Sequence, residues 1–110
     1  MKRIASELLD ETVRRLVAAL QPEAIYLYGS HVYGQPHEDS DVDLLVVVRE
    51  SSLPPHRRAV TAYRCLRGLF LPADVKVVTR TEFERRAHWQ SSVERAAKDK
   101  GRVLYGSAIG

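Results

Sequence analysis

Two short apolar runs enclose a polar connection in the first half of the chain, and this pattern constrains the fold more than any other feature. The first run, Ala24–Tyr28, stops at Gly29. The second run, Leu44–Val48, is unbroken and follows Asp41 and Asp43. Apolar runs of this length between turn-forming residues are typical of buried strands. The pattern therefore predicts two strands joined by a polar loop.

The turn after the first run is suited to holding an anion. Gly29 can adopt turn conformations at little cost and lets a ligand approach the backbone closely. Ser30 adds a hydroxyl group and a nearby amide. Most Gly-Ser pairs are plain surface turns, so this pair indicates a phosphate site only in combination with the acidic residues further along the chain.

Asp41 and Asp43 open the second run and are spaced to act together. Side chains alternate along a strand that rises roughly 3.3 Å per residue, so these two point the same way about 6.6 Å apart. Like charges at that separation favour a bound cation. Mg²⁺ commonly binds one or two carboxylates and leaves its other positions to water and phosphate. An isolated Asp-x-Asp is more often a solvated strand start.

Taken in order, these elements resemble the signature of the nucleotidyltransferase superfamily with the DNA-polymerase-β-like fold. The length of 110 residues is similar to the minimal nucleotidyltransferase (MNT) group, and the resemblance covers nearly the whole chain. It implies that Gly29, Ser30 and Ser40 bind the nucleotide. It also implies that Asp41 and Asp43 bind Mg²⁺ or Mn²⁺, and that a third carboxylate on a neighbouring strand completes the site.

Asp74 is the residue to which the resemblance assigns the third carboxylate, as both a catalytic group and a metal ligand. It lies early in a third predicted strand, Ala73–Thr79, after the second long helix. An acidic residue there can also be merely exposed. Lys76 shares its face of the strand, where an apolar residue is expected; it either pairs with Asp74 or reaches a phosphate.

The remaining pattern predicts helices around these strands. Helical periodicity runs over residues 4–20, and a second helix follows Pro54 to about Leu66 or Arg67. Its arginines are expected to be solvated or to meet phosphate or an acidic partner. Two capping boxes, beginning at Thr81 and Ser91, predict two short helices, and residues 102–105 an edge strand. We therefore expect one α+β domain over residues 1–110, with a small mixed sheet flanked by helices.

Composition narrows the functional classes. The net charge is +3, but five acidic residues belong to the proposed site, which leaves 17 basic residues against nine acidic ones elsewhere. Such a surface attracts nucleic acid, ATP or an acidic partner, or is simply solvated. No apolar run approaches a membrane span of about 20 residues, and no signal peptide is visible. We expect a cytoplasmic protein. Its single cysteine, Cys65, is expected to be a buried helix residue.

The resemblance implies an adenylyltransferase that moves AMP from ATP, or another NTP, to a hydroxyl group. MNT proteins often act beside a small HEPN-type protein as the antitoxin of a toxin–antitoxin pair, so such a partner is implied; nucleic acid is a less favoured one. The alternatives are a non-catalytic antitoxin and an antibiotic nucleotidyltransferase. Intact Asp41, Asp43 and Asp74 disfavour the first, and the missing substrate domain disfavours the second.

Overall fold

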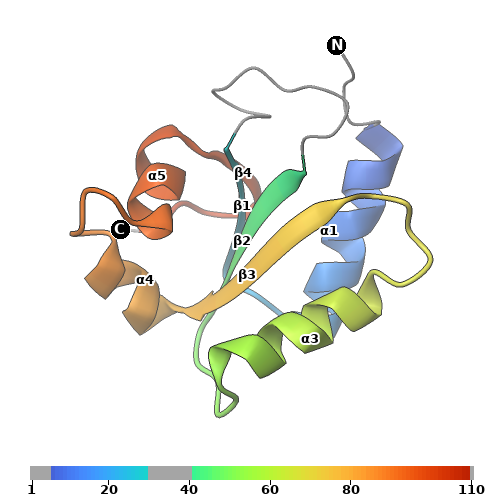
Figure 1. The fold of residues 1–110 in the computed structure, drawn as a ribbon, viewed down its shortest axis with the longest axis horizontal. Helices are drawn as coiled ribbons and strands as arrows, with labels where there is room; N and C mark the ends of the chain where they lie inside the picture. The colour runs from blue at the N-terminus through green and yellow to red at the C-terminus, as the bar shows by residue number, and fades with distance from the viewer. Residues whose placement is uncertain (1–5, 30–40, 110) are drawn as a thin grey trace.

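The computed structural model describes residues 6–29 and 41–109, and in it helices cover both faces of a four-stranded sheet (Figure 1). The elements in chain order are α1 (Ser6–Leu20), β1 (Ala24–Tyr28), β2 (Val42–Val48), α3 (Pro55–Cys65), β3 (Ala73–Thr79), α4 (Arg80–Arg86), α5 (Val93–Lys100) and β4 (Arg102–Gly106). No helix in the described part of the chain is long and apolar enough to cross a membrane.

The sheet is mixed, as the sequence predicted. Its strand order is β3-β2-β1-β4. The inner strand β1 runs antiparallel to both neighbours, β2 and β4. The other inner strand, β2, is parallel to the edge strand β3. The long connection through α3 makes this parallel pairing possible, because parallel strands need a crossover. The predicted α+β class is confirmed.

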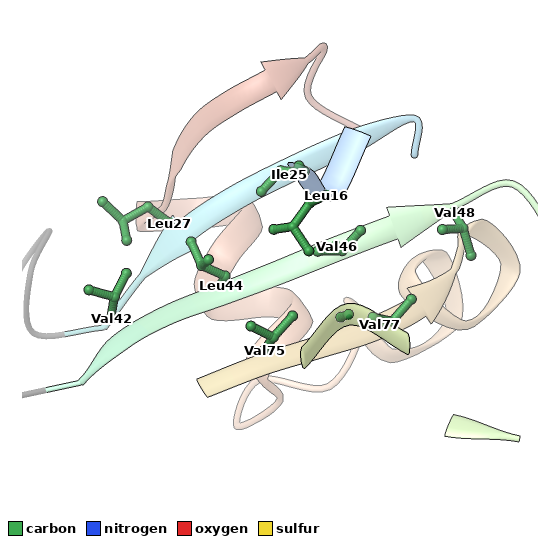
Figure 2. Packing of buried hydrophobic residues seen from close by; sticks show 10 residues of the cluster. Leu16, Ile25, Leu27, Val42, Leu44, Val46, Val48, Val75 and Val77 are labelled. Carbon is green, nitrogen blue, oxygen red and sulfur yellow. The ribbon is translucent and has the colours of Figure 1, made fainter. Parts of the chain in front are cut away.

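Each face of the sheet has its own apolar core. Helices α1 and α3 cover one face and α4 and α5 the other (Figure 1). On the α1/α3 face, the clustered side chains (Figure 2) are Leu16, Ile25, Leu27, Val42, Leu44, Val46, Val48, Ala62, Val75 and Val77. Because both faces of β2 are covered beyond Asp43, residues 44–48 of the strand are a continuous apolar run.

The α4/α5 face is held by an aromatic pair. The ring of Tyr26 on β1 stacks on Phe83 of α4, with the ring centroids 5.5 Å apart. The Tyr26 hydroxyl accepts a 2.7 Å hydrogen bond from the backbone N–H of Ile109, which is itself buried. The C-terminal segment is thereby attached to this face.

The start of α4 differs from the sequence prediction. The N-cap is Thr79 with Glu82 at N3, rather than Thr81 with Glu84. Both pairs have the capping-box spacing. The first is used because β3 ends in extended geometry at Thr79 and continues directly into the helix.

The start of α5 is shifted by one residue. Ser92 caps this helix and accepts a hydrogen bond from Arg95 N–H, whereas the prediction placed the cap at Ser91. Glu94, predicted to close the box, is instead buried and forms an ion pair with Arg86 at 3.6 Å. Helix α3 ends at Cys65, one or two residues before the predicted end at Leu66 or Arg67.

Candidate active site

Gly29 lies against the carboxylate of Asp43. The antiparallel register of β1 and β2 places Tyr28 opposite Asp43, so the residue that follows β1 reaches the start of β2. Gly29 has a φ of +82°, and a Cβ built on it would overlap Asp43 Oδ2. Only glycine satisfies both the left-handed backbone and this close approach. The predicted turn is thus in contact with Asp43, one member of the predicted acidic pair.

Asp43 and Asp74 are neighbours across the sheet. They are Cα partners in the parallel register of β2 and β3, and adjacent strands lie about 4.8 Å apart. Both alternate with residues of the α1/α3 core, so both side chains belong to the α4/α5 face. Asp43 and Asp74 are half-buried, and Asp41, directly before β2, is exposed. The sheet therefore brings together carboxylates that are 31 residues apart in sequence.

The acidic residues suit a hard divalent cation but do not form a three-ligand cluster. Within residues 6–29 and 41–109, no three His, Cys, Asp or Glu side chains are grouped closely enough to hold a metal ion. Mg²⁺ commonly takes only one or two protein carboxylates and completes its shell with water and substrate phosphate. A pair of aspartates on adjacent strands fits that requirement, and Asp41 stands two residues before the pair.

The Asp74 carboxylate is held by Tyr63 of α3. The Tyr63 hydroxyl accepts a 2.8 Å hydrogen bond from Val75 N–H at the free edge of β3. Its own proton then points to Asp74 Oδ1, 3.4 Å away. Because a phenol has a single O–H donor, this contact uses it. Tyr63 thus connects the position of α3 to the orientation of Asp74.

The structure tests some of the remaining sequence predictions and not others. Ser30 and Ser40, predicted to bind nucleotide, lie outside the described residues. Lys76 is exposed and forms no ion pair with any residue that the structure describes, so it does not pair with Asp74. Cys65 is half-buried rather than fully buried, and burial raises the pKa of its thiol. A thiol of raised pKa is a poor nucleophile.

Two residues of α3 with contacts to β3 were not predicted from the sequence. Tyr63 was not predicted as a site residue, and Arg58, like the other arginines of its helix, was expected to be solvated or to meet phosphate or an acidic partner. Arg58 is only 7% exposed; its side chain donates to the carbonyl oxygens of Leu53 and Val77 and to Glu82 Oε1. No sequence signal separates it from the neighbouring arginines, because its burial depends on where α3 packs against β3.

The sequence was compared with known families and proteins. Residues 7–104 match the family model of the nucleotidyltransferase domain. A search of curated protein sequences found no match.

Similar folds occur among solved structures. A chain of a toxin–antitoxin crystallised with AMP-PNP has a TM-score of 0.56 and 21% identity, with 89% of this chain and 73% of that chain covered. A mutant of the toxin–antitoxin MntA–HpeT has a TM-score of 0.55 and 19% identity over the same shares. A proposed nucleotidyltransferase from Sulfolobus solfataricus has a TM-score of 0.54 and 18% identity, with 100% and 96% covered. At these identities the likeness concerns the fold.

Proposed function

This chain belongs to the nucleotidyltransferase domain family, and we propose that it transfers AMP from ATP to a hydroxyl group of a partner protein. The observation that carries the proposal is the contact of Gly29 with Asp43 beside Asp74. A glycine turn in contact with one of two paired carboxylates suits the triphosphate and the cation of a nucleotide substrate.

The nucleotide is assigned to the turn and the first two carboxylates. Gly29 leaves the backbone open to the triphosphate, with Ser30 and Ser40 as further contacts. Asp41, Asp43 and Asp74 are the residues that would hold Mg²⁺ or Mn²⁺, with water and substrate phosphate as further ligands. When bound, such a cation would neutralise phosphate charge and lower the pKa of a coordinated hydroxyl. Since carboxylates repel a free triphosphate, these residues bind the nucleotide together with its cation.

The transfer step is assigned to Asp74. The acceptor oxygen forms a bond to the α-phosphorus while the bond between the α-phosphorus and the bridging oxygen of pyrophosphate breaks. Asp74 takes the proton of the acceptor hydroxyl, and pyrophosphate leaves with the bonding electron pair. Phosphoryl-type transfer depends mainly on positioning and charge stabilisation. The 3.4 Å contact with Tyr63 supports this role, because it orients the carboxylate.

The partner is proposed to be a HEPN-type toxin, with this chain as its antitoxin. The fold likeness to a chain of a toxin–antitoxin crystallised with AMP-PNP supports both a nucleotide and a protein partner. An antitoxin that acts by contact alone is the competing function. Neutralisation of the partner by adenylyl transfer requires the carboxylates, whereas neutralisation by contact alone does not.

Asp74→Asn tests the proposal. Asparagine keeps the shape but loses the charge and basicity, so adenylyl transfer is expected to fall at least about a hundredfold, within the usual range for a general base. ATP–Mg²⁺ affinity should change only several-fold, since Asp41 and Asp43 remain. Mass spectrometry of the protein encoded beside this one, after incubation with ATP and Mg²⁺, measures the transfer.

The control is the double change of Asp41 and Asp43 to Asn, which is expected to lose metal-dependent nucleotide binding as well. Undiminished transfer by Asp74→Asn would place the base elsewhere. Neutralisation of the partner by all these variants would favour action by contact alone.

A further inference from the structure

A groove runs along the free edge of β3, beginning at Asp74. Its volume is about 420 Å³. One wall belongs to α3 and the other to the helices of the opposite face, which lie on either side of β3 in Figure 1. The polar side chains that line it are those of His56, Tyr63, Asp74, Lys76, Arg86 and Glu94.

The backbone along this edge is already engaged. Tyr63 accepts from Val75 N–H at 2.8 Å, and Arg58 donates to Val77 O at 3.3 Å. Glu82 accepts from Thr79 N–H at 2.9 Å. A strand added to this edge would have to displace these bonds. The groove is therefore suited to recognising side chains rather than to extending the sheet.

Lys76 carries a positive charge in the groove that no ion pair with a described residue neutralises. Arg86 is paired with the buried Glu94 at 3.6 Å. Lys76 is exposed and has no ion pair with any residue in the described ranges. It lies on the same face as Asp74, roughly 6.6 Å further along the strand. Lysines often protect an exposed sheet edge from pairing, but here side chains from α3 and α4 already do so.

We propose that this groove binds the acceptor, and that Lys76 selects a protein segment with an acidic side chain about two residues from the accepting hydroxyl. In an extended segment that spacing matches the spacing from Asp74 to Lys76. The inference rests on the proposed function, because it places the accepting hydroxyl at Asp74. A protein segment is favoured over nucleic acid, whose binding relies on many phosphate contacts, whereas the groove offers one uncompensated cation.

Synthetic peptides that carry one serine or tyrosine test the inference. One set has Asp two residues from the hydroxyl on either side, and the matched set has Lys there. Each set is incubated with ATP, Mg²⁺ and the full chain, and AMP incorporation gives kcat/KM. The parent is expected to prefer the acidic set about two- to fivefold, the effect of one exposed ion pair. Lys76→Met should remove the preference and Lys76→Glu should reverse it.

The ratio of the two sets within each variant cancels any general loss of activity. Lys98→Glu is the matched control: it makes the same charge change at an exposed position of α5 outside this groove, and should keep the parental ratio. A ratio unchanged by Lys76→Glu, no labelling of any peptide, or labelling of an RNA oligonucleotide instead would each overturn the inference.

The proposed function is judged separately in the same experiment. If Asp74→Asn loses transfer but changes at Lys76 do not alter the peptide preference, the acceptor groove is refuted and the transferase proposal is not. Transfer that survives in Asp74→Asn refutes the role of that carboxylate. Calorimetry of ATP with and without Mg²⁺ reports nucleotide binding even where no peptide is labelled.

Discussion

At the scale of single residues, the candidate site depends on an absent side chain. Gly29 combines a φ of +82° with a backbone that touches Asp43. Gly68 provides a comparison, since its φ of +91° is similar but nothing lies within 4 Å of the position of a Cβ. Substitution of Gly68 therefore tests the effect of backbone strain alone, whereas substitution of Gly29 tests strain together with contact with the Asp43 carboxylate.

Gly29→Ala is expected to weaken ATP–Mg²⁺ binding at least about tenfold, because the new methyl group must displace the Asp43 carboxylate, which we propose helps to hold the cation. Isothermal titration calorimetry measures the affinity. Gly68→Ala should cost a similar strain, about 1–2 kcal/mol of stability, and leave the affinity unchanged. Equal affinities in the two variants would show that the contact with Asp43 is unimportant for the nucleotide.

Tyr63→Phe removes the hydroxyl that orients Asp74 while keeping the ring. We expect transfer to fall about tenfold with the KM for ATP unchanged, because a misoriented base affects chemistry more than nucleotide binding. Steady-state kinetics gives both constants. In an Asp74→Asn background the same change should have no further effect on transfer. A full tenfold loss in that background would mean that Tyr63 acts independently of the carboxylate.

At the scale of elements, one ion pair joins α3, β3 and α4. Arg58 Nη1 lies 2.7 Å from Glu82 Oε1, with both side chains mostly buried. The same oxygen of Glu82 accepts from Thr79 N–H, which closes the capping box of α4. Burial raises the pKa of Glu82, but the hydrogen bonds from Arg58 and Thr79 outweigh it, so the pKa lies below its usual 4.5.

This lowered pKa predicts how stability depends on pH. The contribution of Glu82 is fully present above pH 4.5, the value for the unfolded chain, and is lost as the pH falls through the lower folded-state pKa. Glu82→Gln should cost roughly 1–3 kcal/mol at neutral pH. Its difference from the parent should shrink on acidification, as measured by urea unfolding between pH 7 and 3.

Glu84→Gln is the matched control in the same helix. Glu84 is exposed and lies 3.8 Å from Arg80, and such surface pairs contribute little. It should unfold like the parent at every pH. A gap between parent and Glu82→Gln that stays constant with pH would contradict the assigned charge interaction.

At the scale of the whole molecule, the distribution of charge is expected to govern how the proposed nucleotide binds. The chain has a net charge of +3, yet Asp41, Asp43 and Asp74 lie at the start of adjacent strands. A triphosphate brought there without a cation meets like charge. The favourable long-range field of the basic surface and the local repulsion of the carboxylates therefore act in opposite directions.

ATP is expected to raise the melting temperature only when Mg²⁺ is present. A ligand at a hundred times its Kd stabilises the fold by about 2.7 kcal/mol, which raises the melting temperature of a chain of this size by about 10 °C. Differential scanning fluorimetry with ATP plus Mg²⁺, and with ATP plus EDTA, makes the comparison. Equal shifts under both conditions would argue against a metal site at these aspartates.

The sequence by itself determined the features that follow local rules. The strands Ala24–Tyr28 and Ala73–Thr79 were predicted with the bounds that the structure has, because apolar runs and alternation are properties of neighbouring residues. Gly29 and the Asp41–Asp43 pair were chosen as candidate site residues for the same reason, since the preference of glycine for turns and the spacing of two aspartates can be read from neighbouring residues.

Tertiary structure alone decided which distant residues meet. The register that sets Asp43 beside Asp74 is specified by pairing between β2 and β3. The reach of Tyr63 to the edge of β3 and the burial of Arg58 depend on how α3 lies across the sheet. The choice of Thr79 over Thr81 as a cap also followed from this packing, because Arg58 holds Glu82. Each outcome depends on contacts between segments far apart in sequence, and local propensity carries no information about those contacts.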